Sequence, residues 1–361
     1  MLNSKYYIPI LKWKRAEQNA LKTLTKERKK YITPLIQFVM PKAKPNEQFE
    51  ETVTRFEKQL LEIPNKIIDV WGTTAVFVDV SLLFTTSLKV KSLKTIVQKG
   101  NKLGGTFIPV IHLHDEDDIK EKAFFLARQN NRGLCIRLVC PDFLNQNKLN
   151  QDIARLLLSS KLKEKDIDLL VDIKETNGGK EKYIKYLNLS QNILNIKKWR
   201  TFILAASSFP EDLTKCWIDE ENLLPRIEWK CFKDCLTSSN LQRKPIFADY
   251  TIQHPVYKEA TQFFHPSSSI KYTLANHWLI LKGKKQEFGM YLASAAELVK
   301  DKRFYGENFS DGDKYIVKRA KHYSSYIKNP EIKGTGSAET WLRAGINHHL
   351  ELVVNQIANL P

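Results

Sequence analysis

The chain has 361 residues, of which 42% are hydrophobic, so it can bury a full core and suits one large α/β domain or two ordinary ones. Lysine and arginine total 57 against 40 aspartate and glutamate, a net charge of +17 that fits either a polyanionic partner or a generally lysine-rich composition. The five cysteines include no Cys-x-x-Cys pair, which argues against a disulfide framework and a zinc ribbon.

Basic side chains cluster near the N-terminus. A clustered excess favours a polyanionic partner, although basic residues in the last turn of a helix also complement its dipole. No signal-peptide cleavage pattern is present, and no stretch reaches the ~18 uncharged apolar residues of a membrane span. We therefore expect a soluble, cytoplasmic protein without a membrane partner. The nine basic residues among the first thirty are Lys5, Lys12, Lys14, Arg15, Lys22, Lys26, Arg28, Lys29 and Lys30.

Eight apolar runs of strand length recur along the chain, and most end in a charged or polar residue. A strand buried on both faces reads as such a continuous run, with its polar residues at the end that opens on a cleft. The spacing of the runs leaves room for one helix and two loops each, as in βα units. The runs are Tyr7–Lys12, Pro34–Phe38, Ala75–Ser81, Phe107–His112, Leu134–Val139, Asp168–Glu175, Phe202–Ser208 and Pro245–Tyr250.

Amphipathic helical segments follow each of the first seven runs, the last of them over 213–235 in two pieces broken at Pro225. Such units form an open sheet or a closed barrel. An open sheet commonly carries a glycine-rich turn after its first strand, but the turn here, Lys12–Arg15, has no glycine. The count of eight and the polar strand ends favour a (β/α)8 barrel of the TIM type, with strands in residues 6–255.

The pattern changes after residue 255. A hairpin and two helices are predicted over 256–336, and a last helix over 338–360 supplies the eighth helix of the barrel. The segment 256–336 then leaves the C-terminal rim, and we expect it to form a lid that brings His254, Tyr272 or Asp311 to the strand-end charges. Replacing 267–285 by a short glycine linker is expected to leave a folded barrel that lacks function.

Several short motifs together resemble the bacterial and phage "beta protein" family over almost the whole chain. The resemblance implies an association with prophages and defence-related gene clusters, and it implies no particular reaction. The motifs are Tyr7–Lys12 with Glu17, Asp249-Tyr250 with His254-Pro255, Tyr272, Trp278, Ser310–Asp313, and Trp341 with Gly345–His349.

The C-terminal strand ends predict a charged mouth. Converging titratable groups at that face of a barrel often mark a site, but a salt-bridged plug is the structural alternative, because buried charges must be paired. Predicted catalytic residues are Asp79, His112, Asp172, Lys174 and Asp249, and predicted substrate- or phosphate-binding residues are Lys12, Arg137, His254 and Tyr272. Gln37, Ser207, His114 and Glu175 accompany them.

Three chemistries fit these residue types. Carboxylates with His112 could hold a divalent metal that activates water on a phosphodiester, although only His112 and His114 have the spacing of a ligand pair. Asp172 and Lys174 could instead transfer a proton as a pair. A Schiff base on Lys12 is conceivable, but no other feature supports a pyridoxal cofactor. The cofactor stays open, with a divalent metal as the one candidate.

Two functions therefore remain in view. The first is a component of an anti-phage or prophage-encoded system that acts on or binds nucleotide or nucleic-acid phosphate at the barrel mouth, as a hydrolase if it is an enzyme. The second is a non-catalytic subunit that binds nucleic acid or a protein partner encoded nearby and regulates it. Elsewhere, Ser310 with Asp313 predicts a helix cap, and at least one of His348 and His349 is expected to be buried and hydrogen-bonded.

Overall fold

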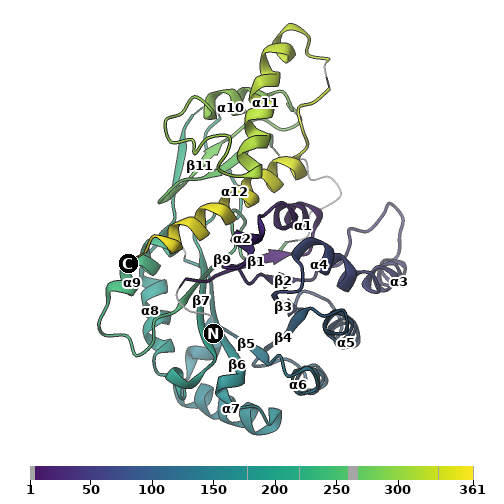
Figure 1. Ribbon diagram of the computed structural model, residues 1–361, viewed down its shortest axis with the longest axis vertical. Helices are drawn as coiled ribbons and strands as arrows, with labels where there is room; N and C mark the ends of the chain where they lie inside the picture. The colour runs from purple at the N-terminus through teal and green to yellow at the C-terminus, as the bar shows by residue number, and fades with distance from the viewer. Residues whose placement is uncertain (1–4, 177, 219, 259–266, 332, 361) are drawn as a thin grey trace.

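A computed structural model describes residues 5–176, 178–218, 220–258, 267–331 and 333–360 (Figure 1). Eight parallel strands close into a barrel in the order β1-β2-β3-β4-β5-β6-β7-β9, with helices around its outside. The predicted (β/α)8 barrel is confirmed. Its strands are β1 (Tyr7–Lys12), β2 (Leu35–Gln37), β3 (Ala75–Asp79), β4 (Thr106–His112), β5 (Leu134–Val139), β6 (Ile167–Glu175), β7 (Thr201–Ser207) and β9 (Ile246–Asp249).

Two apolar layers hold the barrel together. Because side chains alternate along a strand, every second residue points inward, and Ile8, Leu35, Phe77 and Leu170 belong to the small interior cluster. The outward-facing residues pack with the helices in a larger core. The helices between the strands are α1 (Arg15–Lys22), α2 (Lys26–Lys29), α3 (Phe49–Leu60), α4 (Ile63–Trp71), α5 (Thr86–Lys102), α6 (Asp117–Asn130), α7 (Gln146–Ser160), α8 (Glu181–Ser190) and α9 (Ile227–Thr237). Short 3-10 turns lie at η1 (Cys140–Leu144), η2 (Glu164–Asp166) and η3 (Ile196–Lys198).

The segment between β7 and α9 differs from the prediction. The first of the two expected helical pieces contains a strand, β8 (Asn222–Pro225), and only the second piece forms a helix, α9. β8 pairs antiparallel with β11 (His277–Leu281), and β11 pairs with β10 (Ile270–Thr273). The break at Pro225 is real, since β8 ends there and α9 begins two residues later.

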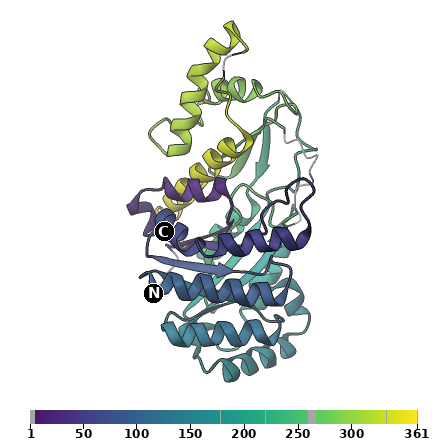
Figure 2. The same cartoon turned by 90° about the vertical axis from the view of Figure 1, so that its right-hand side faces the viewer.

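This second sheet forms a side lobe with α10 (Met290–Leu298) and α11 (Asp311–Lys328), around an apolar cluster of its own. The lobe projects from the side of the barrel that carries α1, α9 and α12, roughly perpendicular to the barrel axis (Figures 1 and 2). It therefore arises from two loops, one after β7 and one after β9.

The long helix α12 (Ala338–Ala358) runs between the barrel and the side lobe (Figure 1). Ser337 caps it by accepting a hydrogen bond from the backbone N–H of Thr340 at 3.3 Å. On the barrel side, the Asn347 side chain donates to the carbonyl of Ala20 in α1 at 3.1 Å. Trp341 lies in the core of the lobe and Ile346 in the larger core of the barrel, so one helix belongs to both parts.

No helix in the described part of the chain is long and apolar enough to span a membrane.

Candidate functional site

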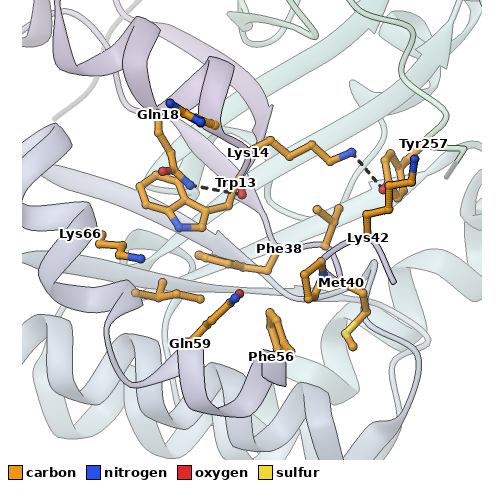
Figure 3. A pocket seen from close by; sticks show the side chains of 14 residues that line it. Trp13, Lys14, Gln18, Phe38, Met40, Lys42, Phe56, Gln59, Lys66 and Tyr257 are labelled. Carbon is orange, nitrogen blue, oxygen red and sulfur yellow. Dashed lines mark hydrogen bonds between the residues drawn. The ribbon is translucent and has the colours of Figure 1, made fainter. Parts of the chain in front are cut away.

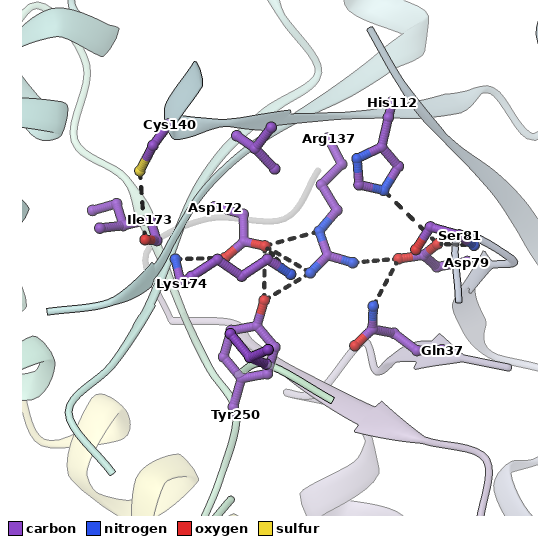
Figure 4. A network of polar contacts seen from close by, with 12 residues as sticks. Gln37, Asp79, Ser81, His112, Arg137, Cys140, Asp172, Ile173, Lys174 and Tyr250 are labelled. Carbon is purple, nitrogen blue, oxygen red and sulfur yellow. Dashed lines mark hydrogen bonds and ion pairs between the residues drawn. The ribbon is translucent and has the colours of Figure 1, made fainter. Parts of the chain in front are cut away.

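Two features lie at the C-terminal end of the barrel. One is a pocket of about 370 Å³ beyond the ends of β1 and β2, lined by Trp13 and Phe38 among others (Figure 3). The other is a network of polar contacts inside the mouth, centred on Arg137 (Figure 4). The candidate site is built from this network.

Arg137 connects three strands. Its Nε and Nη2 donate to Oδ2 of Asp172 on β6 at 3.1 and 2.7 Å, and its Nη1 pairs with Asp79 on β3. Tyr250, which follows β9, accepts from Nη2 at 2.7 Å and donates to Asp172 at 2.7 Å. Gln37 on β2 donates to Asp79 at 3.2 Å. The sequence brings these groups together because each lies at an inward-facing position near the end of its strand.

The network fixes the charges of its carboxylates. Burial alone would raise the pKa of Asp172, but the charges of Lys174 and Arg137 hold it well below its usual range. Burial acts on Asp79 in the same way, and there Arg137, His112 and Ser81 together hold the pKa well below its usual range. Both carboxylates are therefore ionised at physiological pH, and both form ion pairs with the guanidinium of Arg137.

Lys174 reaches the same carboxylate from the rim. Its Nζ lies 3.0 Å from Oδ2 of Asp172, and its backbone N–H donates to Oδ1 at 2.9 Å. The residue has φ +64°, a conformation that lysine rarely adopts, at the irregular end of β6. Strain of this kind clusters at functional sites. With 31% of its side chain exposed, Lys174 is the cation of the network that an incoming group can meet.

Lys12 is buried in the mouth without a carboxylate in ion-pair contact, as far as the described residues show. Its Nζ donates to the carbonyl of His254 at 3.3 Å and lies 5.7 Å from the ring centre of Tyr250. Burial lowers its pKa to about 8, while nearby Glu17 opposes that shift. Glu17 is itself held by Gln253, at 2.9 Å, and burial raises its pKa.

The predicted histidines have separate partners. His254 Nε2 lies 3.1 Å from Glu175 at the rim. His112 Nε2 is 3.9 Å from Asp79, whereas His114 lies beyond the strand, 3.2 Å from Asp142. His112 and His114 thus do not form the expected ligand pair, because β4 ends at His112 and strand alternation stops there.

Two predicted residues lie outside the mouth. Asp249 points outward, where it accepts a hydrogen bond from Tyr7 and contacts His349 Nε2 at 2.9 Å. Tyr272 lies in the side lobe, where its hydroxyl donates to Asp313 at 2.8 Å. Tyr250 occupies the inward position assigned to Asp249, and continuing the alternation from Ile246 and Ala248 would have identified it. Ser207, at the end of β7, is buried, and its hydroxyl oxygen accepts a hydrogen bond from the backbone N–H of Phe209 at 3.1 Å.

Only one of the three residues that the predicted lid was expected to bring to the mouth makes a contact there. His254 reaches Lys12, but Asp311 pairs with Arg343 at 3.8 Å, and neither Asp311 nor Tyr272 contacts the strand-end charges in the described contacts. Asp311 and Tyr272 lie away from the strand-end charges because the side lobe projects beside the barrel (Figure 2).

The predicted cap and histidine contacts are confirmed. Ser310 accepts from the backbone N–H of Asp313 at 3.0 Å and so caps α11. His348 and His349 are both buried, His348 contacting Asp313 at 2.8 Å and His349 contacting Asp249.

A divalent metal does not fit the mouth as it stands. The guanidinium of Arg137 occupies the position between Asp79 and Asp172 that a metal ion would take. Within the described ranges, no group of three or more histidine, cysteine, aspartate or glutamate side chains is arranged to hold a metal ion.

Comparison with curated proteins finds no match for this chain. A family model described as "Beta protein" matches residues 7–355, nearly the whole chain and both parts of the structure. The chain therefore belongs to the beta protein family.

Proposed function

We propose that the barrel mouth binds a phosphate group of a nucleotide or nucleic acid. The observation that carries the proposal is the unpaired cation Lys12. Arg137 and Lys174 share Asp79 and Asp172, while the ammonium of Lys12 donates to a backbone carbonyl and has no acidic partner among the described residues. A buried charge without a partner is costly, so an anionic ligand would complete this site.

The geometry favours binding over general-base catalysis. Asp172 accepts hydrogen bonds from Arg137, Tyr250 and Lys174, and its low pKa makes it a poor proton acceptor. Lys12 is the exception, because an amine with a pKa of about 8 is partly neutral near physiological pH. If the protein is a hydrolase, Lys12 is the group that we expect to move a proton.

Equilibrium binding of a fluorescein-labelled single strand of about 12 deoxyadenosines tests the proposal, with anisotropy measured at several salt concentrations between about 50 and 200 mM. Lys174→Gln should weaken binding and reduce the slope of log K against log salt by about 0.7, the value for one lost phosphate contact on a single strand. Lys165→Gln is the matched control, because Lys165 precedes β6 and is exposed at the opposite end of the barrel. Equal effects of the two variants, or no binding by the unaltered protein, would overturn the proposal.

A role in phage defence is proposed from the family membership and the resemblance behind it. The alternative function, a non-catalytic subunit that regulates a partner, uses the same anion site. A cleavage assay separates the two, because a partner-free preparation should cleave nucleic acid only if the chain is itself the enzyme. In plaque assays Lys12→Met should abolish protection in either case.

A further inference from the structure

The pocket beside the mouth joins aromatic rings with cations. The rings of Trp13 and Phe38 lie 6.2 Å apart at 49°, and Tyr257 closes one end. Four cations line the same pocket, and the lining contains no aspartate or glutamate. The cations are Lys14, Arg15, Lys42 and Lys66. The pocket therefore suits a ligand that combines a flat ring system with negative charge.

Two of these four cations have partners in the described structure, and the other two have no acidic partner there. Arg15 pairs with Glu339 at 3.4 Å, and Lys14 donates to the hydroxyl of Tyr257 at 3.1 Å. Lys42 and Lys66 are exposed and have no acidic partner among the residues described. Charge of one sign that no acid balances attracts an anionic ligand.

We infer that this pocket holds one base of a single-stranded nucleic acid, with the flanking phosphates on the lysines. At about 370 Å³ the pocket is near the lower end of the ~300–1,000 Å³ typical of ligand sites, so it accepts one nucleotide unit. Aromatic side chains bind bases by stacking in such proteins without reading their sequence.

The placement of the cations favours a strand over a free nucleotide. Figure 3 shows Lys66 at one end of the pocket and Lys14 and Lys42 at the other, with Trp13 and Phe38 between them. A nucleoside with phosphates on both its 5′ and its 3′ side is the repeating unit of a strand, whereas a nucleoside 5′-phosphate has phosphate on one side. Trp13 also follows Lys12 directly, so a strand leaving the pocket can place a phosphate at the mouth. The inference therefore rests on the proposed function and adds its ligand class.

The test uses the full chain and the labelled oligodeoxyadenosine strand. The double variant Lys42→Gln/Lys66→Gln should lower the affinity at least tenfold and reduce the salt slope by about 1.4, which corresponds to two phosphates on a single strand. Lys165→Gln/Lys197→Gln should change neither quantity, since both lysines are exposed and precede strands at the far end of the barrel.

Stacking is tested separately. Trp13→Leu should weaken binding of the strand about tenfold, as expected when one stacked base is lost, and should leave the salt slope unchanged. An abasic strand of equal length should bind the unaltered protein and Trp13→Leu equally. Melting temperatures of the variants show whether each remains folded.

The outcomes separate the two proposals. If Lys174→Gln weakens binding and the pocket variants do not, the pocket inference fails while the phosphate site stands. If neither set weakens binding, both fail. Binding of deoxyadenosine monophosphate as tight as that of the strand, or of a duplex tighter than that of the strand, would overturn the assignment to a single strand.

Discussion

Arg137 pairs with carboxylates from two other strands, so its removal takes the buried guanidinium away from two buried negative charges. We predict that Arg137→Met lowers the free energy of unfolding by about 3–5 kcal/mol, as for other broken buried ion pairs. Urea denaturation measures the loss. Arg155→Gln is the control, because Arg155 is 74% exposed and its pair with Asp152 should contribute less than about 1 kcal/mol. Similar losses in both variants would contradict the central place of Arg137.

Lys12 gives the binding site a pH dependence. Its pKa of about 8 lies below the ordinary value of lysine because of burial, so the ammonium is charged at pH 7 and neutral above about pH 9. Affinity for the oligodeoxyadenosine strand should be constant below pH 7 and fall as pH rises through 8, while Lys12→Met should show a lower, flat profile. Phosphodiesters do not titrate in this range. If the affinity of Lys12→Met fell with pH as steeply as that of the unaltered protein, another group would be responsible.

Glu228 should make stability depend on pH in the opposite sense to an ordinary surface carboxylate. Burial raises its pKa from 4.5 to about 7, although Arg226 opposes the shift. The folded state then binds a proton that the unfolded state has lost, so stability is highest at low pH and falls between about pH 4.5 and 7, by at most about 1.4 kcal/mol per unit. Glu228→Gln should flatten this fall in urea titrations, and Glu121→Gln on the exposed face of α6 should not.

Sequence patterns predicted much of the mouth at the residue level. Asp79, Arg137 and Asp172 meet because each was assigned to the correct end of a correctly identified strand. Asp249 was misplaced because a shift of one residue along a strand changes the face, and Tyr250 takes the inward position. The pairing of Arg137 with both carboxylates depends on barrel closure, which no local pattern contains.

At the scale of elements, β8 shows what local patterns miss. Its four residues pair with β11, more than fifty positions further along the chain, so the strand exists only through a tertiary contact. The barrel strands were predictable because each one is a long apolar run buried on both faces.

Asn222 is the residue that joins β8 to its surroundings. Its side chain accepts from the backbone N–H of Trp217 at 2.8 Å and donates to the carbonyls of Trp217 and Ile280 at 2.9 and 3.1 Å. Asn222→Ala leaves these groups unpaired, and we predict a loss of about 1–3 kcal/mol in the free energy of unfolding. Asn240→Ala, at an exposed position before β9, is the control. A loss no greater than that of the control would show that strand pairing alone holds β8.

At the scale of the whole molecule, the barrel and the side lobe are joined by buried polar contacts as well as by apolar packing. His349 on α12 contacts Asp249 of the barrel at 2.9 Å and Thr273 of the lobe at 3.0 Å. Its neighbour His348 contacts Asp313 and the carbonyl of Thr273, both at 2.8 Å. The lobe is thus attached through the residues that the family motifs contain, although their sequence spacing did not reveal which partners they contact.

Deleting part of the lobe should therefore unfold the barrel, contrary to the expectation drawn from the sequence. The segment 267–285 contains β10 and β11, and Trp278 of β11 lies in the larger barrel core, 5.1 Å from the ring of Phe209. A glycine linker in place of 267–285 would also leave β8 without its partner strand. We predict loss of the cooperative thermal transition, measured by near-ultraviolet circular dichroism. In contrast, a glycine linker in place of residues 329–331, which are exposed and directly follow α11, should lower the melting temperature by only a few degrees. A barrel that still melts cooperatively after the first deletion would show that the two parts fold independently.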